Sequence, residues 1–255
     1  MAESRAVRHR CIRRKLLISV LFGALLGGFV LGLTGFGNGP TAYGVWLHFL
    51  SPQISAPLAA IGSVVGHLVM FRGFRHAMLR DRILPLIVGG LAGVPLGVWI
   101  LTIVPADTFR VLAGMLLAAY SMVSLGGGHR IQISGETPKR DMIAGFLGGI
   151  CGGLASLSGP IVTIWSGLKN WSPDEQRAAY QPYNFAILSA AFVGFGAAGL
   201  LTWELAYVAA LTLPMTLFGV LCGKACYGFV DAGLFRRIVL ILLTVSGCAL
   251  ILRGV

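Results

Sequence analysis

Charged residues are scarce in this sequence. Only 11% of its 255 residues are Asp, Glu, Lys or Arg, whereas 56% are hydrophobic, and the mean hydropathy is +0.83. A soluble domain carries about a quarter charged residues, so the composition excludes that class. Apolar runs of about twenty residues recur along the chain, and each is long enough to cross a hydrocarbon core of ~30 Å. The sequence therefore predicts an all-α, polytopic helical membrane protein.

The motifs of common enzyme and metal sites are absent as well. The sequence contains no G-x-S-x-G, H-E-x-x-H, C-x-x-C or Walker A motif. Its five cysteines fall mostly inside apolar runs and form no metal-ligand pattern. We therefore expect no metal, no cofactor and no enzymatic activity. The lesser alternative is an intramembrane enzyme, whose Ser-His pair would have to join two halves of the chain through His67.

Acidic residues are the rarest charged type. All nine lie at or near the ends of the apolar segments, whereas transporters that bind cations or relay protons often place Asp or Glu within the membrane. This distribution argues against a cation carrier. It leaves His67, inside the second apolar segment, as the best candidate for a proton relay. The alternative is a packed histidine that is hydrogen-bonded to a neighbouring helix.

The basic residues give the chain a formal charge of +11. They lie in short loops, where orientation signals are found, so we interpret them as topology signals and expect no nucleic-acid partner. Their distribution predicts a multi-pass inner-membrane protein whose basic N-terminus, residues 1–15, is cytoplasmic. The basic residues between Arg72 and Arg82 are a further candidate contact for anionic membrane lipids.

About eight transmembrane segments are expected, at about 16–34, 54–71, 83–103, 109–125, 142–157, 177–199, 203–222 and 233–252. They divide into two homologous repeats, 16–128 and 141–255, joined by a polar linker, 129–140. The sequence leaves open whether the repeats are parallel or inverted, and whether the chain forms a homo-oligomer. Glycines four residues apart, such as Gly28 and Gly32, predict close helix contacts.

Each repeat contains an apolar helix interrupted by Gly-Pro and small polar residues. Placing Gly39-Pro40 on Gly159-Pro160 aligns the two interruptions at an offset of 120 residues. Proline is favoured in the first helical turn, so we expect short half-helices at about 41–50 and 161–169. A broken helix within the membrane is a recurrent way to build a solute site in a transporter.

The tail of each repeat adds a second shared pattern. Gly97 is followed after eleven residues by Phe109-Arg110, and Gly223 is followed in the same way by Phe235-Arg236. Together with the glycine-rich helices broken at Gly-Pro, this pattern resembles the TauE/SafE family of bacterial membrane transporters. The resemblance covers nearly the whole chain from about Leu16. It implies export or permeation of sulfite or a sulfonate-linked anion.

The physics of the interruptions independently suits an anion. A half-helix N-terminus exposes unpaired N–H groups and a partial positive charge. The candidate substrate-binding residues are Thr34, Asn38, Gly39, Pro40 and Thr41 at the first interruption and Ser156, Ser158, Gly159 and Pro160 at the second. The alternative is that these small residues only permit close helix packing.

A polar face lies in the first half of the sixth expected segment. Arg177, Tyr180, Gln181 and Asn184 are spaced i, i+3, i+4 and i+7, which places them on one helix face. Arg177 would attract an anion by its field, and the other three would line its path. Alternatively, Arg177 extends to the interface and the tyrosines form an interfacial belt.

These observations predict secondary transport of a small oxyanion, such as sulfite, an organosulfonate or a carboxylate. The solute would lie between the two interruptions, and one repeat would rock against the other. A passive anion channel is the main alternative. The expected partners are thus a small anionic solute and membrane lipids.

Overall fold

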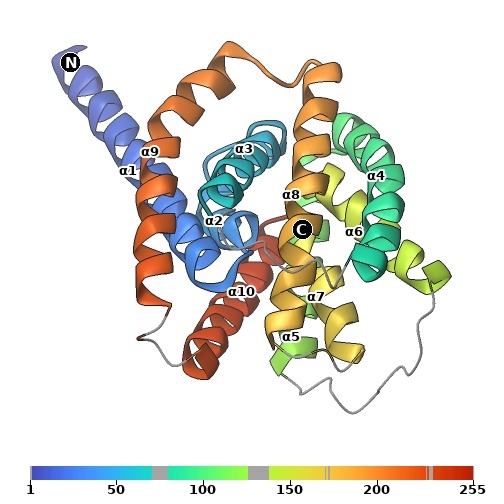
Figure 1. Ribbon diagram of the computed structural model, residues 1–255. Coiled ribbons are helices and arrows are strands. Elements are labelled where there is room, and N and C mark those ends of the chain that lie inside the picture. The colour runs from blue at the N-terminus through green and yellow to red at the C-terminus, as the bar shows by residue number, and fades with distance from the viewer. Residues whose placement is uncertain are drawn as a thin grey trace.

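The computed structural model describes residues 2–70, 80–125, 138–169, 171, 173–227, 229 and 232–254, which form helices without any strand (Figure 1). In chain order the helices are α1 Ala2–Thr34, α2 Asn38–Trp46, α3 Pro52–Met70, α4 Arg80–Ile103, α5 Ala106–Leu125, α6 Pro138–Ala155, α7 Gly159–Leu168, α8 Pro173–Ala197, α9 Trp203–Cys226 and α10 Ala232–Gly254. The expected all-helical fold is confirmed. The expected linker lies outside the described residues up to residue 137.

Five described helices contain a stretch long and apolar enough to cross a membrane: Leu17–Thr34, Pro52–Met70, Ile83–Ile103, Ala106–Leu125 and Trp203–Cys226. The expected segments at 142–157, 177–199 and 233–252 are not among them. Helix α6 begins with three charged residues, Lys139, Arg140 and Asp141, and α8 is polar in its N-terminal half. The apolar part of α10 is the shorter stretch Val239–Leu252. The count of eight therefore stays a prediction.

Two short helices follow breaks of three residues each. Helix α1 ends at Thr34 and α2 begins at Asn38, while α6 ends at Ala155 and α7 begins at Gly159. The two half-helices are thus confirmed, with shifted bounds. The first ends at Trp46 rather than near residue 50, because residues 47–49 form a turn.

The breaks are made by a left-handed residue directly after each long helix. Gly35 has φ 86° and Ser156 has φ 53°. The N–H of each donates to the carbonyl four residues earlier, Gly35 to Leu31 at 2.7 Å and Ser156 to Gly152 at 2.8 Å. A residue in this conformation cannot continue a right-handed helix, so both long helices end here.

The position of this left-handed residue corrects the expected register. Gly35 and Ser156 are 121 residues apart, whereas the Gly-Pro pairs are 120 residues apart. As a result, Pro40 is the third residue of α2 and Pro160 is the second residue of α7. The turn that ends each helix, rather than the proline, defines equivalent positions in the two parts of the chain.

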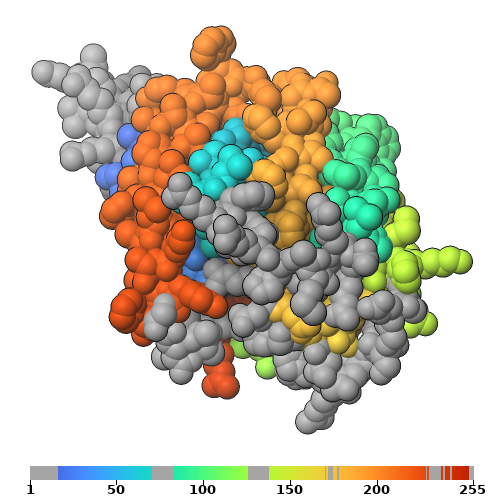
Figure 2. All heavy atoms as spheres, viewed as in Figure 1, coloured from blue at the N-terminus to red at the C-terminus, as the bar shows by residue number. Residues whose placement is uncertain are grey.

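The long helices pair across the chain. Helix α1 packs on α9, α6 packs on α4, α5 packs on α10 and α3 packs on α8. When α1–α5 and α6–α10 are taken as two groups, the first helix of each group therefore contacts the fourth helix of the other group. On the face shown in Figure 2, α3 lies between α9 and α8, and α9 and α4 occupy opposite edges. The outward side chains on these edges are apolar and exposed, among them Trp99, Phe218 and Leu221.

Glycines bring the crossing helices into backbone contact. A Cβ added to Gly28 of α1 would lie 2.2 Å from the Thr216 carbonyl oxygen of α9, and one added to Gly149 of α6 would lie 2.0 Å from the Gly90 carbonyl oxygen of α4. No larger residue fits without separating the helices. The predicted role of these glycines in close helix packing is confirmed.

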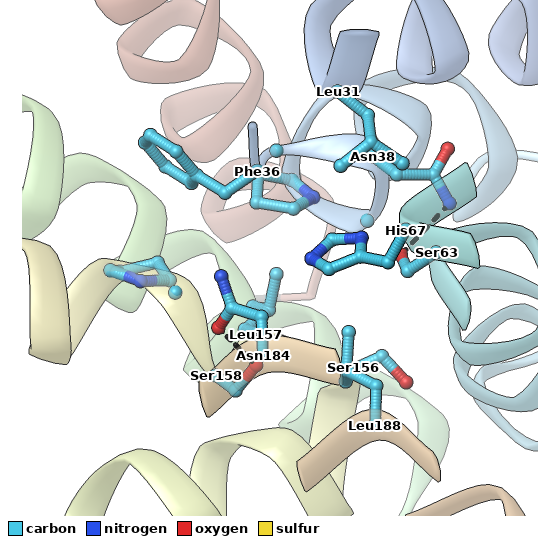
Figure 3. A pocket seen from close by; sticks show the side chains of 15 residues that line it. Leu31, Phe36, Asn38, Ser63, His67, Ser156, Leu157, Ser158, Asn184 and Leu188 are labelled. Atoms are coloured by element: carbon cyan, nitrogen blue, oxygen red, sulfur yellow. Dashed lines mark hydrogen bonds between the residues drawn. The ribbon is translucent and has the colours of Figure 1, made fainter. Parts of the chain in front are cut away.

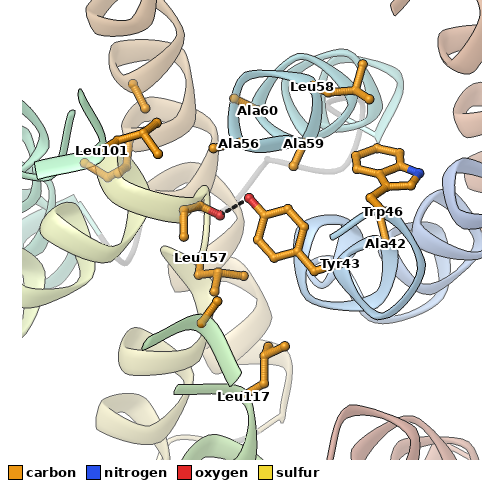
Figure 4. Close-up of a cluster of buried hydrophobic side chains, with 14 of the residues drawn as sticks. Ala42, Tyr43, Trp46, Ala56, Leu58, Ala59, Ala60, Leu101, Leu117 and Leu157 are labelled. Atoms are coloured by element: carbon orange, nitrogen blue, oxygen red, sulfur yellow. Dashed lines mark hydrogen bonds between the residues drawn. The ribbon is translucent and has the colours of Figure 1, made fainter. Parts of the chain in front are cut away.

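The short helix α2 is buried in the middle of the protein. Tyr43 and Trp46 are fully buried against the alanine-rich face of α3 (Figure 4). The Tyr43 hydroxyl donates to the carbonyl of Ala155, the last residue of α6. The Trp46 Nε1–H donates to the Val20 carbonyl at 2.9 Å. The Tyr43 bond therefore ties α2 to the second break, and the Trp46 bond ties the C-terminal end of α2 to α1.

Candidate functional site

A cavity lies where the two breaks meet (Figure 3). Residues 37–40 form one side and residues 156–160 form the other. The two segments are so close that a Cβ added to Gly39 would lie 3.2 Å from the Ser156 carbonyl oxygen. Helix α3 contributes Ser63 and His67, and α8 contributes Asn184 and Leu188. Segments far apart in the sequence therefore build one enclosed site.

The first break carries a buried asparagine that is only half satisfied. The Asn38 Nδ2 donates to the Ala59 carbonyl at 3.1 Å and to the Ser63 hydroxyl at 3.2 Å. Its Oδ1 is buried and has no hydrogen-bond partner among the described residues. This oxygen lies against α1, where a Cβ added to Gly27 would be 2.6 Å from it.

The second break carries a matching serine–asparagine pair. The Ser158 hydroxyl donates to the Asn184 Oδ1 at 2.8 Å, and both side chains are buried. This bond orients the Asn184 amide, so that its Nδ2 lies near Gly159 at the start of α7. The Ser156 hydroxyl points away from this pair and donates to the Ala56 carbonyl at 2.7 Å.

Two helix N-termini point at the same cavity. Helix α2 begins at Asn38 and α7 begins at Gly159, and the first residues of both line the cavity wall. Neither start is capped by a side-chain hydrogen bond. The first backbone N–H groups of a helix lack intrahelical partners and carry a partial positive charge. The arrangement therefore offers hydrogen-bond donors and positive potential from two directions.

His67 extends from α3 into the cavity (Figure 3). Its side chain is buried, and neither Nδ1 nor Nε2 has a hydrogen-bond partner in the described part of the chain. The ring approaches the backbone carbonyl of Ser63, one turn earlier, without hydrogen-bond geometry. The expected alternative, a histidine hydrogen-bonded to a neighbouring helix, is therefore not what the described residues form.

Fixed charge is absent from the described cavity wall, which contains no Asp, Glu, Lys or Arg side chain. Arg177 belongs to α8, but its side chain lies outside the described residues. The expected role of Arg177 thus stays a prediction. Within the described residues, no group of His, Cys, Asp and Glu is arranged to hold a metal ion.

Four of the expected site residues lie beside the first break rather than in the cavity wall. The Thr34 hydroxyl lies 2.8 Å from the Val30 carbonyl and 2.7 Å from the Phe36 carbonyl. Tyr180 donates to the Thr34 carbonyl at 2.6 Å, and Gln181 packs against Gly35. The Thr41 hydroxyl is buried in the first turn of α2. Tyr180 and Gln181 lie about one helical turn before Asn184 on α8. They therefore lie beside the first break, at Thr34 and Gly35, and not in the cavity wall.

Ser63 is a polar wall residue that was not among the candidate site residues. It lies 121 residues before Asn184, so the register set by Gly35 and Ser156 makes the two positions equivalent. The same register pairs His67 with Leu188. The sequence already places Ser63 on the face that corresponds to Asn184, but the alanines at positions 56, 59 and 60 made that face appear poor in polar groups.

A second buried polar cluster fastens α7 to α6. The Lys169 Nζ lies 2.6 Å from the Asp141 Oδ1, and the two side chains are 6% and 5% exposed. The Trp165 Nε1–H donates to the same Oδ1 at 2.6 Å. Trp171 also contacts the ammonium through its ring face. Asp141 lies at the end of an expected segment, and in the structure it is buried and paired.

Comparison with known protein families gives a match over most of the chain. A family model described as "Sulfite exporter TauE/SafE" matches residues 20–250, which is nearly the whole chain. No curated protein and no solved structure matches it. The match agrees with the apolar helices long enough to cross a membrane. The chain is therefore a multi-pass membrane transport protein that belongs to the TauE/SafE family.

Proposed function

We propose that this protein is a secondary transporter of a small oxyanion, such as sulfite, an organosulfonate or a related sulfur-containing or carboxylate anion, and that the solute binds in the cavity between the two breaks. One observation carries the proposal: the uncapped N-termini of α2 and α7 meet at a buried cavity whose described wall has no carboxylate. Helix N-termini with free N–H groups are ready-made anion sites.

The side chains of the wall fit the same chemistry. The Asn184 Nδ2 donates at one side, where the Ser158 hydroxyl holds the amide in place, and the backbone N–H groups at the starts of α2 and α7 add further donors. Such groups replace the water around an oxyanion without a buried cation. Family membership supports the substrate class, because the family is described as sulfite exporters.

The size of the cavity favours a transporter over a passive channel. It has room for about one water molecule, which is less than a sulfite ion requires. The site must therefore widen when the solute enters. We propose that the site widens when the α1–α9 pair moves against the α4–α6 pair, because glycine contacts hold each pair together and each pair contains one helix from either half of the chain.

The setting in the cell follows from the same argument. We place the chain in the bacterial inner membrane with a cytoplasmic N-terminus, on the basis of the basic residues in its short loops. On this arrangement the break residues lie near the midplane, where transporters of broken-helix design bind their solutes.

Thermal stability of the detergent-purified protein tests the anion site. Sulfite, sulfate, thiosulfate, methanesulfonate, taurine and acetate are compared, with sodium and chloride controls. A ligand that binds only the folded state stabilises it by about 2.7 kcal/mol at a hundredfold excess over its dissociation constant. We expect a selective rise in melting temperature with one or more oxyanions.

Matched serine variants localise the effect. Ser158→Ala removes the bond to Asn184 and is expected to lose most of the anion shift, while Ser189→Ala removes a buried hydroxyl on α8 outside the cavity wall and is expected to keep it. A flat response to every anion, together with a shift from a cation or a neutral solute, would overturn the proposed function.

A further inference from the structure

His67 is the one titratable side chain in the described cavity wall. It is 3% exposed, its two ring nitrogens are unpaired, and it projects between Asn38 and Asn184 (Figure 3). The equivalent position on α8 is occupied by Leu188, which fills the opposite part of the wall. A leucine therefore satisfies the packing at this depth, and packing alone does not require the imidazole.

In the described part of the chain, the helices around α3 place no charged side chain in the cavity wall beside this ring. Their described titratable groups include Tyr43, Tyr180 and Tyr183, which donate to backbone carbonyls, the ion pairs Asp107–Arg110 and Asp141–Lys169, Cys151 of α6 and Glu175 near the start of α8. Glu204 and Lys224 are exposed at the ends of α9. None of these groups lines the cavity. The charge state of His67 is thus governed by what enters the cavity.

Charge balance sets what His67 must do. A helix N-terminus is equivalent to roughly +0.5 elementary charge, so the starts of α2 and α7 together offset about one negative charge. A singly charged oxyanion is matched by these two ends. A doubly charged one leaves about one negative charge uncompensated in a buried cavity, where an unpaired charge is costly. Histidine gains a proton readily beside such a charge.

We propose that His67 takes up one proton when a divalent oxyanion binds, so that the cavity carries the dianion and H⁺ together and carries a monoanion without a proton. The proton enters from the same solution as the anion, binds an unpaired ring nitrogen, and leaves with the anion on the other side. This inference rests on the proposed anion site and adds its coupling ion and charge rule.

Proton uptake on binding is the direct test. The purified protein is titrated in weak buffer with a pH indicator, using sulfate and thiosulfate, which are doubly charged near neutral pH, and methanesulfonate, which is singly charged. We expect about one proton per bound divalent anion and close to none per methanesulfonate. Equal uptake for both charge types, or none for either, would overturn the inference and leave the anion site standing.

Variants assign the proton to its residue. His67→Gln keeps a polar side chain of similar size and should abolish proton uptake with sulfate while methanesulfonate affinity is unchanged. His48→Gln, outside the cavity wall, should behave as the wild type. Uptake that persists in His67→Gln would place the proton elsewhere and overturn the assignment.

The wild-type protein gives an independent readout if His67→Gln does not fold. Sulfate affinity should fall about tenfold per pH unit once the pH exceeds the range in which the free site is protonated, whereas methanesulfonate affinity stays flat. A flat profile for sulfate, or binding of monoanions alone, contradicts the charge rule only. Failure of every anion to bind contradicts the proposed function itself, and the two results are therefore distinguishable.

Discussion

At the first break, an asparagine on the short helix α2 donates to a serine on α3; at the second, a serine before the short helix α7 donates to an asparagine on α8. The two partners on the long helices, Ser63 and Asn184, are equivalent positions 121 residues apart. One turn further along, the equivalent positions differ, because His67 on α3 corresponds to Leu188 on α8. The backbone frame of the cavity is duplicated, while its chemistry is not.

The anchors of the two short helices show the same division. Trp46 donates through Nε1 to the Val20 carbonyl, and Trp165 donates through Nε1 to the Asp141 carboxylate. Val20 and Asp141 are again 121 residues apart. The two indoles are 119 residues apart, so both parts use a tryptophan anchor from positions that differ by two residues in this register, and the second part adds a buried ion pair with Lys169. Symmetry of the frame predicts equal responses to some substitutions, and the added groups predict unequal ones.

The largest effect is expected where the frame is duplicated most closely, at the glycine crossings. Gly28→Leu and Gly149→Leu each force a side chain into a carbonyl oxygen of the facing helix. Neither backbone can yield locally, so we expect each variant to lose more than about 3 kcal/mol, at or beyond the usual cost of overpacking. Yield of monodisperse protein and melting temperature measure the loss.

A glycine with more room supplies the control. A Cβ on Gly196 would meet only the flexible Leu201 side chain at 3.2 Å, so Gly196→Ala should be close to neutral. If leucine were tolerated at one crossing and not at the other, the two helix pairs would not be equivalent and the duplicated frame would be wrong.

The second-largest effect is expected at the Asp141–Lys169 ion pair, which the second part of the chain adds to its tryptophan anchor. Asp141→Asn keeps an acceptor for Trp165 and leaves the Lys169 ammonium buried without its counter-charge. Removing one partner of a buried ion pair typically costs about 3–5 kcal/mol. We expect Asp141→Asn to fall in this range and Trp46→Phe, which removes one ordinary hydrogen bond and part of a buried ring, to cost less, about 1–3 kcal/mol. Thermal unfolding in one detergent compares the two.

The double variant separates charge from packing. Adding Lys169→Met to Asp141→Asn removes the uncompensated cation and should recover most of the lost stability, because replacing both members of a buried pair is often nearly neutral. If the double variant were as unstable as the single one, the cluster would act through its shape and not through its charges.

Local patterns in the sequence carried the prediction of the fold. Glycines four apart, the low charge and the two interruptions correctly indicated close-packed helices and half-helices, since each depends on neighbours in the chain. The expected sites of Thr34, Thr41, Tyr180 and Gln181 did not fall on the cavity wall. Their orientation depends on how α8 rotates against the first break, which is a tertiary property.

Two further features were beyond sequence reasoning for a related reason. The Asp141–Lys169 pair joins residues 28 apart through the return of α7 along α6, and nothing in either residue's own surroundings indicates burial. The one-residue difference between the proline register and the helix-end register reflects the left-handed turns at Gly35 and Ser156. Serine rarely adopts that conformation, so only glycine at position 35 signalled it in advance.

The smallest effect concerns these two turn residues. Gly35→Ser would place a side chain at φ 86° against the Gln181 amide, while Ser156→Gly would relieve a serine at φ 53° and remove its bond to the Ala56 carbonyl. The left-handed conformation costs a residue with a Cβ about 1–2 kcal/mol, and the hydrogen bond contributes about 1 kcal/mol. We therefore expect Gly35→Ser to destabilise by about 1–2 kcal/mol and Ser156→Gly to be nearly neutral.

Chemical denaturation in mild detergent resolves differences of this size, with Ser189→Ala as the control for loss of a buried serine hydroxyl. The sign for Ser156→Gly is informative in itself. A gain in stability would mean that the serine is retained at the second break for its place beside the cavity and against its conformational preference. A loss as large as that of Gly35→Ser would mean that the bond from Ser156 to α3 holds the second break in place, so that equivalent turns in the two parts are stabilised by different forces.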